Sequence, residues 1–160
     1  MLQDVGTIAT AVGVLLAVLS LRAARLQRRR QFETIYVQRY WTLMDGLTAD
    51  ALAGRRTDTV SPQDEKAALA YLRLSEDQLE LRREGWISHE TWEIWSAGIK
   101  AQLDRRWPFD VVWQKVAEAN RDAGPDAEYQ LLRKFMNDAV DPHTALPRRV
   151  RFWRAITPSP

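Results

Sequence analysis

The pattern of apolar and polar positions predicts an all-α chain that begins with one long helix. Residues 5–21 carry no charge. At 1.5 Å per residue they would form a helix of roughly 25 Å, slightly shorter than a bilayer hydrocarbon core of about 30 Å. Five arginines follow within nine positions: Arg22, Arg25, Arg28, Arg29 and Arg30. An apolar helix with a one-sided basic flank is typical of a membrane anchor.

We therefore predict a transmembrane anchor over residues 1–24, in a bacterial inner membrane, with the N-terminus outside. The basic flank would keep the rest of the chain in the cytoplasm. The alternative interpretation is a buried core helix. Small residues recur within the span at helical spacing, and they are Gly6, Ala9, Thr10, Gly13 and Ala17. Such a face lets helix backbones approach closely, which predicts self-association or docking against another membrane helix.

Beyond the arginines the same helix is predicted to continue into a cytosolic stalk. Neither proline nor glycine occurs between Ser20 and Asp45. Apolar residues recur there at the helical period, namely Phe32, Tyr36, Tyr40, Leu43, Met44 and Leu47. Trp41 falls at the edge of this stripe, so we expect it to be exposed for a partner.

Serine, proline and glycine residues typical of helix ends divide the remaining chain into further predicted helices. We predict that Ser61 caps the N-terminus of a helix, that Pro62 is its first residue, and that Gly85 ends it in a left-handed conformation. Further helices are expected from Ser88, Pro108 and Pro125. Trp92, Trp95, Trp107 and Trp113 should fill the core. The prediction is a cytosolic bundle of about five helices over residues 25–140, followed by a basic-aromatic tail over 141–160.

Several of these stretches resemble an uncharacterised bacterial family of single-span membrane-anchored helical domains, a domain of unknown function. They are "FETIYVQRYW", "YLRLSEDQLELRREGWIS" at 71–88, and the Trp-Pro-Phe start at Trp107. The resemblance covers most of residues 10–120. It implies the same topology and fold, and it implies no activity and no functional residues.

No motif in the chain points to a known chemistry. The absence of cysteine excludes disulfides, thiolate nucleophiles and cysteine-ligated zinc. Neither a glycine-rich phosphate loop nor a nucleophile elbow occurs. The nearest approach to metal-ligand spacing is His89 and Glu93, which Glu76 or Glu80 could join. We therefore expect no metal, no cofactor and no enzymatic activity.

The favoured interpretation of these polar residues is a solvated surface. Arg73 would pair with Asp77, and Glu80 with Arg83. His89 would cap a helix end.

The tail "PRRVRFWRAI" mixes arginine with aromatic residues. Its candidates are Arg148, Arg149, Arg151, Phe152, Trp153 and Arg154. They suit lipid headgroups better than nucleic acid, and Trp153 could instead pack back on the bundle.

Together these features predict a membrane-anchored adaptor, scaffold or regulator that binds a protein partner or itself. One alternative is a membrane-tethered effector or enzyme that uses Glu76, Glu80 and His89. The other is a nucleic-acid binder that uses the tail and the arginine flank.

Overall fold

The fold is all-α, as predicted. The computed structural model describes residues 2–124, 128–138 and 140–143; in the first helix it describes the side chains of residues 13, 14, 16–24, 27, 28 and 30 onward. No strand occurs among these residues. The helices are α1 (Leu2–Asp45), α2 (Ala49–Leu52), α3 (Pro62–Glu84), α4 (His89–Arg105), α5 (Phe109–Ala119) and α6 (Gln130–Asp138).

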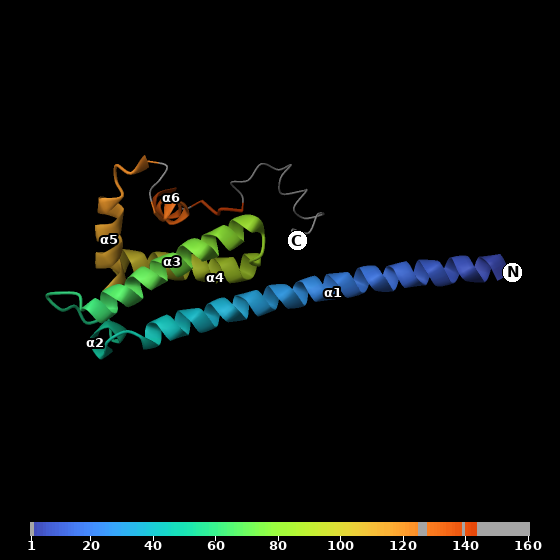
Figure 1. Ribbon diagram of the computed structural model, residues 1–160, viewed down its shortest axis with the longest axis horizontal. Coiled ribbons are helices and arrows are strands. Elements are labelled where there is room, and N and C mark those ends of the chain that lie inside the picture. Colours follow the sequence, from blue (N-terminus) through green and yellow to red (C-terminus); the bar gives the residue numbers. More distant parts are fainter. Residues whose placement is uncertain (1, 125–127, 139, 144–160) are drawn as a thin grey trace.

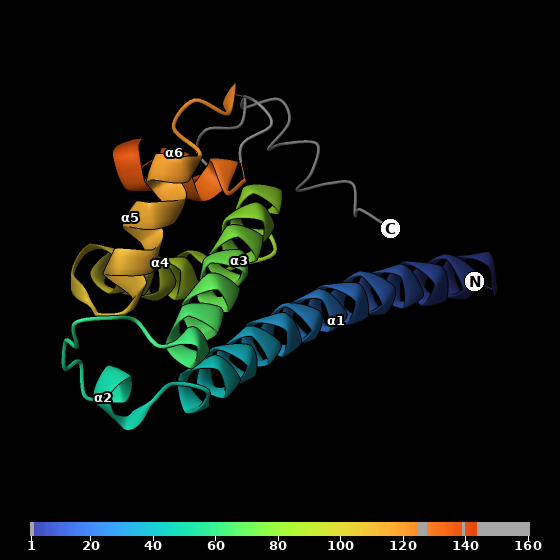
Figure 2. The same cartoon turned by 60° about the vertical axis from the view of Figure 1, so that its left-hand side comes forward.

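One long helix projects from a small bundle. The C-terminal part of α1 lies along α3, and its N-terminal part extends far beyond the other helices (Figure 1). The chain turns at α2 and returns through α3, which packs against α1, α5 and α6, while α4 packs against α5. Figure 2 shows α3 crossing between α1 on one side and α5 and α6 on the other. Helix α3 is therefore the centre of the fold.

The predicted transmembrane anchor is contradicted. In the part of the chain that the structure describes, no helix combines the length and the apolar character that a membrane span needs. The uncharged stretch of residues 5–21 would rise only about 25 Å as a helix, which is less than a hydrocarbon core of about 30 Å, and charged Arg22 follows it directly. The predicted inner-membrane location, which rested on this span, is corrected with it.

Short polar side chains set the helix starts, largely where the sequence predicts them. The Ser61 side chain caps α3 with Pro62 in the first turn, and the Ser88 side chain caps α4. Gly85 ends α3 with φ of 84°, a conformation that costs glycine little and other residues more. The sequence interpretation missed the four-residue helix α2, which Thr48 caps.

The last predicted helix begins later than expected. Proline at position 125 suggested its start, but α6 begins at Gln130, after Tyr129 with φ of 57°. Pro108 lies immediately before α5, and the peptide bond that joins it to Trp107 is cis.

Aromatic residues fill the bundle core. Trp92, Trp107 and Trp113 are buried as predicted, whereas Trp95 is only partly buried. The Tyr71 ring contacts the Phe109 ring at 5.0 Å, and the Trp92 ring contacts the Phe135 ring at 5.6 Å. These contacts join α3 to α5 and α4 to α6. Burial of such large rings dominates the stability of a small bundle.

Candidate functional site

The projecting part of α1 exposes large apolar side chains. Val14, Leu16 and Leu21 are each about 60% exposed, and Val18 and Leu19 are also exposed. The described contacts of α1 with the bundle include the Phe32 ring against Trp86 at 5.4 Å and Glu33, which accepts a hydrogen bond from the Ser88 backbone N–H at 3.0 Å. The exposed segment thus lies before the part of α1 that the bundle holds. Exposed apolar surface of this kind is typical of sites where proteins bind partners.

The predicted packing face and basic flank lie on this same segment. A Cβ atom added at Gly13 would meet nothing within 4 Å, and Ala17 is exposed. Arg22, Arg28 and Arg30 are exposed. The side chains of Gly6, Ala9, Thr10, Arg25 and Arg29 lie outside those described. Association through this face stays a prediction.

Trp41 is 59% exposed, and its ring lies edge-on to Tyr40 at 5.2 Å. Val37, one turn earlier on α1, is also exposed. Exposed apolar surface therefore continues onto the part of α1 that packs on the bundle. Partner contact through Trp41 stays a prediction. The predicted tail residues, Arg148 to Arg154, lie outside the described residues.

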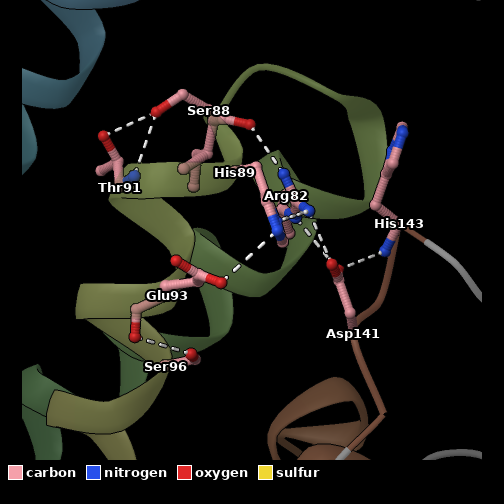
Figure 3. Close-up of polar contacts among 9 residues, drawn as sticks. Arg82, Ser88, His89, Thr91, Glu93, Ser96, Asp141 and His143 are labelled. Carbon is pink, nitrogen blue, oxygen red and sulfur yellow. Dashed lines mark hydrogen bonds and ion pairs between the residues drawn. The ribbon is translucent and has the colours of Figure 1, made fainter.

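A buried arginine organises the far end of α3 (Figure 3). Arg82 donates from Nε and Nη2 to the two carboxylate oxygens of Asp141, at 3.0 and 2.6 Å. Its Nη1 donates to the Ile87 carbonyl at 3.1 Å, and its Nη2 lies 3.4 Å from His89 Nδ1. Its guanidinium also lies over the Trp92 ring at 5.9 Å. A bidentate pair of this kind fixes geometry as well as charge.

The charge around Arg82 favours ionised Asp141. Burial raises the pKa of Asp141, but the Arg82 hydrogen bond and the His143 backbone N–H at 2.9 Å together outweigh it and hold the pKa below its usual value. His89 lies 3.4 Å from Glu93, at the exposed edge of this cluster. Arg82 is only 5% exposed, so the cluster joins α3, α4 and the chain after α6 rather than offering its cation to a ligand.

Glu76 has a role that the sequence interpretation missed. Its carboxylate accepts the backbone N–H groups of Leu131 and Leu132, at 2.9 and 2.7 Å, and so caps the start of α6. Burial raises the pKa of Glu76, and these hydrogen bonds oppose that rise. The sequence signal for this role is Tyr129, the residue before α6. Tyrosine cannot cap a helix as serine or aspartate does, so the first N–H groups of α6 require an acceptor elsewhere in the chain.

The residues of the predicted alternative enzyme site bind different partners. Glu76 caps α6, Glu80 forms an ion pair with Arg83 at 2.8 Å, and His89 approaches Arg82 and Glu93. The predicted pairing of Glu80 with Arg83 is thus confirmed, but the predicted surface role of Glu76 is wrong. Among the described residues no three histidine, aspartate or glutamate side chains are grouped to hold a metal ion.

A groove of about 480 Å³ separates the exposed faces of α1 and α3. Its lining includes Ile35, Arg39 and Leu43 of α1 and Arg73, Leu74 and Asp77 of α3. The predicted ion pair between Arg73 and Asp77 is not formed in the described part of the chain.

No protein-family model, curated protein or solved structure matches this chain. The predicted family resemblance therefore stays a prediction.

Proposed function

We propose that this protein is a helical adaptor or scaffold that binds a protein partner, or a second copy of itself, through the projecting part of α1. The observation that carries the proposal is the exposure of Val14, Leu16 and Leu21 on a helix that extends beyond its own bundle. Five apolar side chains of this size, exposed along less than three turns, favour burial against another protein surface.

The way the bundle holds α1 supports the same proposal: the bundle contacts α1 from Phe32 onward, and the part of α1 before Phe32 projects as an arm. Phe32 and Glu33 fix α1 to the bundle, through Trp86 and the Ser88 backbone. A continuous helix transmits that fixed position along its axis, so the thirty residues before Phe32 reach about 45 Å from the bundle. An arm held in this way loses little conformational entropy on binding.

Photo-cross-linking tests the proposal. A photoreactive phenylalanine derivative replaces Leu19 in the full chain, and a matched chain carries it at Gln114, an exposed polar position on α5. Both chains are irradiated in the cells that make the protein. We expect position 19 to form a protein adduct of defined mass, and position 114 to form none.

Replacing Leu16 and Leu21 with serine in the first chain should reduce the adduct by about tenfold or more, because two large apolar side chains are removed from the interface. The absence of a position-specific protein adduct would refute the proposal. An adduct that the serine substitutions leave unchanged would refute the role of these side chains.

A further inference from the structure

A second surface, distinct from the projecting arm, lies on the pair formed by α1 and α3. One side of this pair is covered by α4: the Tyr36 ring contacts the Trp95 ring at 6.0 Å, and Gln102 donates a hydrogen bond to the Tyr40 hydroxyl at 3.0 Å. The other side contains the groove of about 480 Å³, and no described helix covers it.

The shape of the groove suits the binding of a helix. Ile35, Arg39 and Leu43 follow one another at four-residue spacing on α1, and Arg73, Leu74 and Asp77 share one face of α3. Buried Leu74 and half-buried Leu43 make an apolar floor, and 46% exposed Ile35 stands at its edge. Two rows of side chains at these spacings leave a channel into which the ridge of a third helix packs.

Charge determines which helix fits. Arg39 and Arg73 are exposed and line the groove, and neither forms an ion pair with any described residue. Arg39 lies over the Tyr36 ring at 5.3 Å, which holds its side chain against α1. Asp77 is the acidic residue among those that line the groove, so the lining carries a net charge of +1 from two arginines and one aspartate. Complementary charge on the occupant is therefore negative.

The rest of this chain does not supply such an occupant. Residues 144–160 contain four arginines and no acidic residue, so the C-terminal segment has the wrong charge. The projecting part of α1 has the same defect, because its apolar run leads into five arginines. A helix with acidic flanks must come from another protein.

We propose that the groove between α1 and α3 binds an amphipathic helix of a partner protein whose apolar ridge is flanked by aspartate or glutamate. Leucine-sized side chains fill the channel over Leu43 and Leu74. The acidic flanks contact Arg39 and Arg73. This inference goes beyond the proposed function, because it concerns a different surface and does not depend on the projecting arm.

A displayed library of helical peptides tests the inference. The library fixes leucine at i, i+4 and i+7 and varies the other positions among Asp, Glu, Lys, Arg, Gln and Ala, and it is selected on the immobilised full chain. We expect aspartate and glutamate to be enriched over lysine and arginine beside the leucines. Failure to enrich any peptide, or enrichment without an acidic excess, would overturn the proposal.

Charge reversal then assigns the site. The best selected peptide should bind the Arg39→Glu/Arg73→Glu variant about tenfold or more weakly, as expected for loss and reversal of facing charges. The matched control is Arg105→Glu/Arg121→Glu, which changes net charge equally at exposed positions of the chain outside the groove. The control should bind within about twofold of the unmodified protein. Equal weakening of both variants would show nonspecific charge attraction and overturn the proposal.

Two further measurements complete the test. The Arg39→Gln/Arg73→Gln variant repeats the binding measurement with the two charges neutralised instead of reversed. Circular dichroism checks folding in every variant. Native mass is recorded for the unmodified protein and for Ile35→Asp. A dimer that Ile35→Asp dissociates would assign the groove to a second copy of this chain and overturn the acidic-helix proposal.

Discussion

Arg82 and Asp141 are joined by two hydrogen bonds, at 3.0 and 2.6 Å, although 59 positions separate them in the chain. The pair fixes the segment after α6 to the end of α3. Because Arg82 is buried, the guanidinium depends on this carboxylate for its charge compensation. The end of the described bundle is thus held by a polar contact as well as by apolar packing.

Asp141→Asn should lower the free energy of unfolding by about 2–3 kcal/mol, because it leaves the buried Arg82 cation without its counter-charge. Urea denaturation at neutral pH measures the change. The matched control is Glu80→Gln, which removes an exposed ion pair with Arg83 and should cost less than about 1 kcal/mol. Equal losses in the two variants would contradict a special role for the Arg82 pair.

Stability should fall in acid as two carboxylates are protonated. Burial raises the pKa of Asp64, but hydrogen bonds from Thr48 and Ser61 outweigh it, so the pKa lies below its usual value. Asp141 is shifted in the same direction. A depressed pKa contributes stability that is present above the unfolded-state value, about 4, and is lost as pH falls through the folded-state value.

Asp64→Asn should therefore be less stable at neutral pH, by about 2 kcal/mol, and should lose less stability than the unmodified protein between pH 5 and pH 2.5. Thermal unfolding across that range measures both effects. A parallel pH profile for the two proteins would show that Asp64 does not contribute to the acid transition.

Glu76→Gln should loosen the start of α6. A glutamine side chain has one acceptor oxygen where the carboxylate has two, so one of the N–H groups of Leu131 and Leu132 loses its acceptor, at a cost of about 1 kcal/mol. Hydrogen exchange at these two amides should accelerate while exchange in α4 is unchanged. Unchanged exchange at both amides would refute the capping role, and Glu80→Gln again serves as the control.

Two glycines should respond oppositely to alanine. Gly85 has φ of 84°, where a side chain is strained, so Gly85→Ala should destabilise the protein by about 1 kcal/mol. Gly98 lies within α4, and an added Cβ meets nothing within 4 Å, so Gly98→Ala should stabilise it by roughly 0.5–1 kcal/mol. Urea denaturation of both variants measures the difference, and effects of the same sign would contradict this account.

The sequence predicts the parts of this fold that depend on local chemistry. Ser61, Ser88 and Gly85 mark helix ends because capping and left-handed conformations involve only neighbouring residues. The helical period likewise identifies the apolar face with Tyr36 and Met44 buried. The transmembrane interpretation of α1 went wrong because the uncharged run of residues 5–21 was counted as a span, although as a helix it would rise only about 25 Å and Arg22 follows it directly.

The sequence by itself determined an all-α chain, most of its helix limits and an apolar N-terminal arm, since these follow from spacing and from residues close together in the chain. Only the tertiary structure decided that Arg82 meets Asp141, that Glu76 caps α6 and that Arg39 and Arg73 line one groove. The physical reason is that a charged side chain on a helix surface has the same local pattern whether solvent or another segment faces it. Its partner is determined by how the helices pack.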